Sequence, residues 1–463
     1  MPQSEYQHSP AVVWTIVASQ FTPPFMFSGV AVALPTLGAD LHAGAVSLGL
    51  METLFLGGGL AFLLPIGRLA DVTDKRTLYK YGLFAFGISS LILSTLSWMP
   101  LMLLLRFCQG LTSAIFATTG PAILADIVPP ARRGRVFGVS LGMVYAGLSL
   151  GPIVAGEIIP VFGWRGVFLC GAILLLCGFA LTHRLLPSAW RKPERSSVHI
   201  PSASWMATAV LLFVASSATM RTLWLGTVFF CLGSAAVVRF VRLQSQLATP
   251  FLDLQALRVH HVLRDALTTQ LLLYLNAFAS IFLLSLFTQV TLGCTPRQSG
   301  QVLATGTVLM AAIAPLAGRL ADKIRPTTLS SSGCALVFVS ACMATRFNET
   351  TDITYVITML AVQGLGYALF SSPNMTTIMG SVPPESLSMA SALGAKARSI
   401  GMVTGMLITG LLFSLNYGQE TVTAHPERLV DTVLPVYWVL VGTSALAFGF
   451  SCWTIHQNRS MQR

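Results

Sequence analysis

Apolar runs of about 20 residues recur along most of this 463-residue chain, and each is long enough to cross a hydrocarbon core of about 30 Å. Hydrophobic residues make up 54% of the sequence, whereas charged residues make up only 10%. Every backbone polar group needs an internal partner in hydrocarbon, and these runs are too long and too uniformly apolar for β-barrel strands. The sequence therefore predicts an all-α polytopic membrane protein.

Fourteen membrane spans are predicted from the apolar runs. Two of them, at 204–220 and 222–240, are short and are joined by a hairpin around Arg221, so twelve spans with an interfacial hairpin are the alternative. The predicted spans lie near 11–36, 46–66, 78–98, 100–125, 136–160, 166–187, 204–220, 222–240, 267–291, 299–317, 328–346, 353–379, 387–415 and 434–455.

Basic residues indicate the orientation of these spans. Lys and Arg accumulate in loops that stay in the cytoplasm, and most of the 28 in this chain fall in alternate loops if the N-terminus is cytoplasmic. Both termini are therefore predicted to be cytoplasmic, in a multi-pass protein of the plasma (inner) membrane. Because the basic residues are distributed loop by loop, the net charge of +11 needs no nucleic-acid partner.

Two short motifs occur twice along the chain at nearly the same offset. GRLAD stands at 67–71 and 318–322, and VPP stands at 128–130 and 382–384. Parallel repeats are typical of transporters, in which two similar bundles rock around a site between them. The predicted organisation is an N-terminal six-helix bundle at 1–190, a linker with two extra transmembrane helices at 191–248, and a C-terminal six-helix bundle at 249–463.

The GRLAD segments concentrate charge at the cytoplasmic ends of two spans. Gly67 and Gly318 are predicted to allow a tight bend, and Asp71 and Asp322 are predicted to satisfy the free N–H groups of the following helix. A plain solvated turn is the alternative for either copy, but two copies in register favour a functional role. The residues of these segments that we single out are Gly67, Arg68, Asp71, Arg76, Gly318, Arg319 and Asp322.

Together these segments resemble the major facilitator superfamily, and in particular its fourteen-span drug:proton antiporter branch. GRLADVTDKR is similar to the loop motif G-x-L-a-D-r-x-G-r-k, and RFCQGLTSA is similar to R-x-x-q-G-x-g-a-a of the fourth span. GLSLGPIVAG resembles the exporter-associated motif G-x-x-x-G-P-x-x-G-G. The resemblance implies that the GRLAD segments and this last motif form a conformational gate. The residues that match the last motif are Gly147, Gly151, Pro152 and Gly156.

The resemblance implies a major facilitator fold, with two six-helix bundles and two extra central helices. It also implies alternating access and export without a cofactor. One position departs from the branch, because Met26 stands where its drug antiporters usually carry an Asp in the first span. Drug-cation specificity and the usual proton route are therefore not expected to carry over unchanged.

Glu52, Arg106 and Glu157 lie inside predicted spans, and each needs a partner, a wet cavity or a function. Glu52 and Arg106 both lie about 9 Å below the outer ends of their spans at ~1.5 Å per residue, and Glu157 lies near the outer end of the fifth. We expect Glu52 and Glu157 to exchange protons, with Arg106 adjusting the carboxylate. A static ion pair that fixes packing is the alternative. Lys396 and Arg398, by contrast, are predicted to snorkel to the cytoplasmic interface.

Polar and proline side chains within the spans define a predicted substrate site near the midplane. Adjacent prolines in FTPPFM break helical hydrogen bonds and suggest a cavity, although polar residues in spans also serve as interhelical contacts. The predicted substrate-binding residues are Pro24, Met26, Gln109, Tyr274, Asn276, Gln363, Tyr367 and Asn374.

The predicted function is that of a secondary active transporter, a proton-coupled antiporter that exports amphipathic organic compounds or drugs. A carrier for a specific metabolite, lipid or siderophore is one alternative, and a non-transporting membrane sensor is another. No metalloprotease, paired CxxC, nucleophile-elbow or phosphate-loop motif is present, so no enzyme, metal or cofactor is expected. The expected partners are a small-molecule substrate, protons and membrane lipids, and the chain is expected to function as a monomer.

Overall fold

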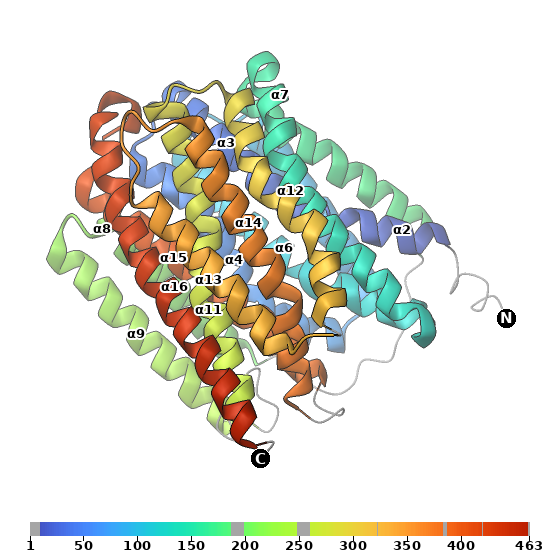
Figure 1. The fold of residues 1–463 in the computed structure, drawn as a ribbon. Coiled ribbons are helices and arrows are strands. Elements are labelled where there is room, and N and C mark those ends of the chain that lie inside the picture. The colour runs from blue at the N-terminus through green and yellow to red at the C-terminus, as the bar shows by residue number, and fades with distance from the viewer. Residues whose placement is uncertain are drawn as a thin grey trace.

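The computed structural model describes residues 10–186, 199–247, 260–321, 323–382, 387–418 and 420–461. Every regular element in these ranges is a helix, and the long helices run side by side in one bundle (Figure 1). The α-helices are α2 (Pro10–Ser19), α3 (Thr22–Asp40), α4 (Ala45–Val72), α5 (Lys75–Leu93), α6 (Met99–Ile127), α7 (Pro130–Leu185), α8 (Ile200–Thr219), α9 (Leu223–Gln246), α11 (His261–Leu286), α12 (Pro296–Ala321), α13 (Pro326–Ala344), α14 (Ile353–Gly380), α15 (Leu387–Asn416) and α16 (Glu427–Met461).

Twelve helices in the described ranges are long and apolar enough to cross a membrane. This confirms a multi-pass, all-helical membrane protein. Within that set, α2 and α3 form a single candidate span, α7 counts once, and α5 is absent. The two helices of the doubtful central pair, α8 and α9, are both included.

Helix α7 is too long for one crossing and is broken at Gly163. Its 56 residues would extend for about 84 Å at 1.5 Å per residue. Gly163 has φ 65° and ψ −174°, a conformation that favours glycine because it has no Cβ. The break is fixed by the next two residues: Trp164 donates its indole N–H to Asp40 at 2.9 Å, and Arg165 pairs with the same carboxylate at 2.7 Å.

The repeat in the sequence is matched by a repeat in helix packing. Helix α4 packs on α6 as α12 packs on α14, and α5 packs on α7 as α13 packs on α16. The two GRLAD segments occupy equivalent places, at the ends of α4 and α12. We therefore refer to residues 10–186 as the N-terminal half and to residues 260–461 as the C-terminal half.

The detail predicted for the GRLAD turns was wrong. Gly67 and Gly318 lie inside α4 and α12, because the helices continue to Val72 and Ala321 instead of bending at the glycines. Asp74, which accepts a hydrogen bond from the backbone N–H of Arg76 at 3.0 Å, is the residue that caps α5.

The two extra helices pack on each other, and α8 also covers the seam between the halves. Val210 and Val214 of α8 form an apolar cluster with Leu60 and Ala61 of α4 and with Val403 of α15. The boundaries predicted at 190/191 and 248/249 lie outside the described residues, as do Asp322 and the prolines of the second VPP turn.

Candidate functional site

A cavity of about 490 Å³ lies between the two halves. Its lining reaches Phe137 of α7 and Pro121 of α6, towards the end of the bundle that carries connections 73–74 and 128–129, which we call the proximal end. The residues that line it are Gln20, Pro23, Pro24, Phe27, Phe55, Leu56, Ser113, Phe116, Ala117, Pro121, Phe137, Ser140, Leu141, Val144, Tyr145, Leu148, Tyr274, Ala277, Phe278, Ile281, Leu303, Gly306, Thr307, Met310, Leu360, Gln363, Gly364, Tyr367, Arg398 and Met402.

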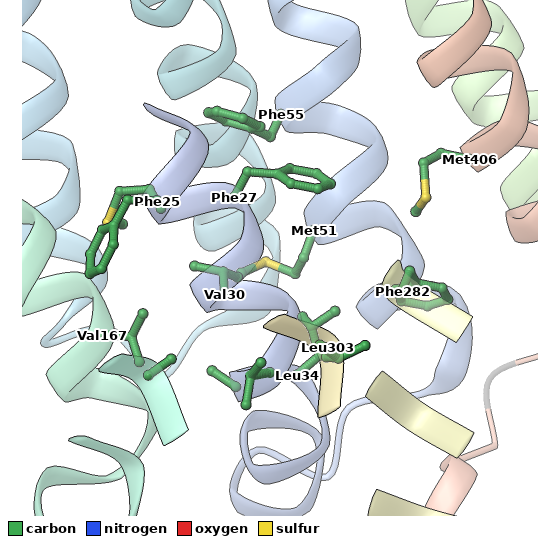
Figure 2. Packing of buried hydrophobic residues seen from close by; sticks show 14 of the residues in the cluster. Phe25, Phe27, Val30, Leu34, Met51, Phe55, Val167, Phe282, Leu303 and Met406 are labelled. Atoms are coloured by element: carbon green, nitrogen blue, oxygen red, sulfur yellow. The ribbon is translucent and has the colours of Figure 1, made fainter. Parts of the chain in front are cut away.

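The opposite end, which carries connections 41–44 and 417–426, is called the distal end, and the halves are in contact there. The rings of Phe27 and Phe278, from opposite halves, have centroids 4.2 Å apart. Beyond them, Ser285 donates to the carbonyl of Ala31 at 2.6 Å. Figure 2 shows Phe27 in a core that draws on both halves, with Phe282 and Leu303 below it.

Two further contacts join the halves at the distal end. The backbone N–H of Ala45 donates to the carbonyl of Glu420 at 2.9 Å, and the Glu157 carboxylate pairs with Arg297 at 2.7 Å. The cavity is therefore closed distally by apolar packing, backbone hydrogen bonds and an ion pair.

The glycines of the exporter-associated motif permit two different close approaches of α7. Gly147 and Gly151 face α3 within the same half, where a Cβ at Gly151 would meet Ser28. Gly156 faces the other half instead, and a Cβ there would lie 2.9 Å from both the Cα atom of Arg297 and the carbonyl oxygen of Pro296. Pro152 also faces α12, because a Cβ on Gly300 would meet its carbonyl oxygen.

Four of the predicted substrate-binding residues line the cavity: Pro24, Tyr274, Gln363 and Tyr367. Gln363 donates to the hydroxyl of Ser280 at 3.1 Å, which orients its carboxamide. Tyr367 donates to the carbonyl of Leu273 at 2.9 Å.

The other four predicted substrate-binding residues lie outside the cavity lining. Met26 packs against Gly171 of α7, and Gln109 donates to Ser90 at 2.8 Å within the N-terminal half. Asn276 and Asn374 donate to the carbonyls of Leu440 and Ala266 at 3.0 and 3.3 Å. These four side chains point towards neighbouring helices of their own half. The position of a residue along a span predicts its depth in the membrane but not the direction in which its side chain points.

Glu52 and Arg106 form a buried ion pair in the N-terminal half. The distance between their charged atoms is 3.1 Å, and neither side chain is exposed. Arg106 also donates to the carbonyl of Met51 at 2.8 Å and to Gln109 at 3.1 Å, and its guanidinium lies 4.5 Å from the ring centroid of Phe55. Phe55 also lines the cavity, whereas Glu52 and Arg106 do not.

The pair leaves one buried acceptor unused. The Oε1 atom of Glu52 has no hydrogen-bond partner among the described residues, whereas its Oε2 atom binds Arg106. Glu157 does not belong to this cluster, because it lies at the distal end with Arg297 and about half of its side chain is exposed (47%).

The predicted gate residues are divided between the two ends of the bundle. At the proximal end, a Cβ at Gly67 would lie 3.7 Å from Thr118, and one at Gly318 would lie 3.4 Å from Ser372. Both glycines therefore face a neighbouring helix of their own half. Arg319 is in the last turn of α12, and Arg68 lies four residues before the end of α4. The side chain of Asp71 lies outside the described part of the structure.

Arg398 is a cavity residue that the predicted substrate site did not include. It lines the cavity with its guanidinium 5.8 Å from the ring centroid of Tyr274. Helix α15 begins at Leu387, which places Arg398 three turns inside the helix. Gln20 and Tyr145 also line the cavity and were not predicted.

Comparisons with known proteins agree with this arrangement. The family model of the Major Facilitator Superfamily matches residues 16–406, and a second match covers residues 266–460. The chain belongs to the Major Facilitator Superfamily. The resemblance seen in the sequence is thereby confirmed, and the protein is a membrane transporter of this family.

Its relatives include transporters with different cargo. The chain is 25% identical over 415 residues to the riboflavin transporter RibZ of Clostridioides difficile. The aligned region covers 88% of this chain and 89% of that protein. It is also 25% identical over 417 residues to the multidrug efflux pump LfrA of Mycolicibacterium smegmatis. The aligned region covers 88% of this chain and 82% of LfrA. Family and relatives confirm a transporter and not an enzyme.

Solved structures show the same fold. A POT family transporter in complex with 5-aminolevulinic acid matches with a TM-score of 0.71 at 14% identity, over 96% of both chains. A point mutant of the nucleoside transporter NupG matches with a TM-score of 0.64 at 11% identity, over 96% of this chain and 99% of that one. At these identities the likeness concerns the fold alone.

Proposed function

We propose that this protein is a proton-coupled antiporter that exports amphipathic organic compounds by alternating access. The observation that carries the proposal is the cavity of about 490 Å³ between two repeated halves, closed distally and extending towards the proximal end. Two packed bundles that meet at one end can expose a central site to either side by rocking. The mostly apolar lining suits amphipathic compounds.

The proposal includes fourteen spans, with both termini in the cytoplasm and the chain acting as a monomer in the plasma membrane. Counting α7 as two spans on either side of Gly163, and adding the 19-residue α5, accounts for the fourteen. The two bundles of six helices then flank α8 and α9. Basic residues at the proximal ends favour a cytoplasmic location for that side, so the structure would correspond to a cytoplasm-facing state.

Glu52 is proposed as the proton-exchanging group, with Arg106 as its partner. A carboxylate that is fully buried, and that keeps one oxygen without a hydrogen bond, is suited to exchange a proton when the halves move. Glu157 is proposed to act at the distal gate through Arg297, and its exposure makes it a second candidate for proton release.

Glu52→Gln should abolish substrate-driven proton movement, because a carboxamide cannot carry the exchanged proton. The measurement is the response of an internal pH dye in proteoliposomes after addition of lipophilic cations, amphipathic anions or neutral compounds. Glu349→Gln, which changes an exposed acid of a connecting segment, is the matched control. Normal proton flux in Glu52→Gln, at equal amounts of folded protein, would favour the static ion pair and contradict the proposed role.

A carrier dedicated to one metabolite is a second candidate function. Met26 packs in the core, at a position where the drug antiporter branch usually has an Asp, and the relative RibZ is named as a riboflavin transporter. A dedicated carrier would respond to one compound in the proteoliposome assay and not to a chemically varied panel.

A further inference from the structure

We propose that the central cavity binds organic anions, in particular molecules with a flat aromatic body and one anionic group. This inference rests on the proposed transport function and specifies the substrate class of the same site. The three observations that carry it are the charge of the lining, the hydrogen-bond partners of Arg398 and the distribution of aromatic rings.

The charge of the cavity lining is positive. Arg398 is the one charged side chain among the described residues that line it, and no Asp or Glu is among them. A guanidinium within the membrane region requires a counter-charge or a wet cavity. A bound anion would supply that counter-charge, whereas a cation would meet an uncompensated like charge.

Arg398 has donors to spare for a ligand. Within the described residues Arg398 makes no hydrogen bond or ion pair. Its guanidinium lies near Tyr145 and over the ring of Tyr274, whose hydroxyl is already hydrogen-bonded to Ser371 at 3.1 Å. The Tyr367 hydroxyl likewise donates to Leu273. A guanidinium has five N–H donors and no acceptor, and it binds carboxylates with two parallel hydrogen bonds. The part of the cavity around Arg398 is therefore suited to a carboxylate or a sulfonate.

The buried acid Glu52 does not reverse the preference of the cavity for anions. Glu52 is paired with Arg106 at 3.1 Å, both side chains are fully buried, and neither lines the cavity. Met26, at the position where drug antiporters of the branch usually have an acid, packs against Gly171 outside the lining. A cationic ligand would thus find no free carboxylate in the described lining.

Aromatic rings from both halves provide the apolar part of the site. Flat aromatic ligands stack on or pack edgewise against such rings, and the volume of about 490 Å³ is in the range of small-molecule sites. The aromatic lining residues are Phe27, Phe55, Phe116, Phe137, Tyr145, Tyr274, Phe278 and Tyr367.

An anionic substrate changes the charge balance of transport. Exchange of one outward-moving monovalent anion for one inward-moving proton transfers two positive charges inward. The membrane potential would therefore drive export together with the proton gradient. Exchange of a monovalent cation for one proton would be electroneutral, so the two substrate classes differ in their dependence on voltage.

The test compares three pyrene probes with an anionic, a neutral and a cationic substituent: pyrene-1-carboxylate, pyrene-1-carboxamide and pyren-1-ylmethylammonium. Binding is measured by fluorescence on full-length protein in nanodiscs, after subtraction of empty nanodiscs. We expect wild-type protein to bind the carboxylate about 10- to 100-fold more tightly than the carboxamide, as for a charge-assisted hydrogen bond. Arg398→Gln should remove this preference, and Arg398→Lys should retain part of it.

Arg346→Gln is the matched control, because it removes one positive charge from an exposed position that does not line the cavity. Tighter binding of the ammonium probe to wild-type protein would overturn the inference. So would an unchanged order of affinities in folded Arg398→Gln protein.

Transport of the same probes into proteoliposomes separates this inference from the proposed function. We expect carboxylate transport to accelerate when a potassium diffusion potential is imposed at constant pH. Carboxylate transport that does not respond to the potential would overturn the predicted charge balance. Preferential binding of the carboxylate without movement of any probe would instead contradict the transport function and leave the substrate class supported.

Discussion

Replacing Arg106 by methionine should lower the free energy of unfolding by about 3–5 kcal/mol, because Glu52 would remain buried without its charged partner. Both side chains of the pair are fully buried, and the guanidinium also satisfies the carbonyl of Met51 and the carboxamide of Gln109. The measurement is unfolding of purified protein in detergent, followed by circular dichroism, with the free energy extrapolated to zero denaturant.

The double variant Arg106→Met with Glu52→Leu provides the control for this prediction. Replacing both members of a buried ion pair by apolar residues of similar size is often neutral, because no unpaired charge is left. We therefore expect the double variant to recover most of the stability that the single variant loses. Strictly additive losses in a double-mutant cycle would show that the pair does not couple and would contradict the assigned geometry.

The all-helical, multi-pass character of the chain was accessible from the sequence because it depends on composition over long windows. Runs of about 20 apolar residues require helices whatever their packing. The pairing of Glu52 with Arg106 also followed from depth, because both lie at a similar distance from the distal ends of α4 and α6, two helices that pack on each other.

The substrate-site prediction was less complete because it depends on helix phase. Tyr274 and Asn276 are two residues apart on α11, yet Tyr274 lines the cavity and Asn276 donates to Leu440 of α16. Two residues correspond to a rotation of about 200° at 3.6 residues per turn, so they face opposite sides of the helix. A nearly uniform apolar helix carries little periodicity from which that phase could be read.

Arg398 shows a second limit of sequence-based prediction, which comes from the use of hydropathy. Its neighbours in the sequence are small and polar, and the more apolar stretch begins only near Gly401. Hydropathy therefore predicts it at the membrane surface, whereas α15 continues back to Leu387 and Arg398 lines the cavity. Hydropathy measures the preference for lipid, and it underestimates how far a helix extends when one face lines a cavity.

Gly156→Leu should change the equilibrium constant between the distally closed and distally open states by roughly 5- to 150-fold, in favour of the open state. This is the range that about 1–3 kcal/mol of overpacking gives in a two-state equilibrium. A Cβ at Gly156 would lie 2.9 Å from the backbone of Pro296 and Arg297, so any side chain pushes the halves apart where they meet. The three atoms nearest to this Cβ all belong to α12 of the other half, so we expect the main effect at the contact between the halves.

The measurement is labelling of a cysteine placed in the cavity, Leu303→Cys, by an impermeant maleimide added from the distal side. Labelling should increase in Gly156→Leu and remain at the parent level in Gly142→Leu, since a Cβ at Gly142 has nothing within 4 Å. Gly151→Leu, whose Cβ would meet Ser28 within one half, should instead lower stability in both conformations. Unchanged labelling in stable Gly156→Leu protein would contradict the view that this contact holds the distal end closed, because the added side chain would then be accommodated without separating α7 from α12.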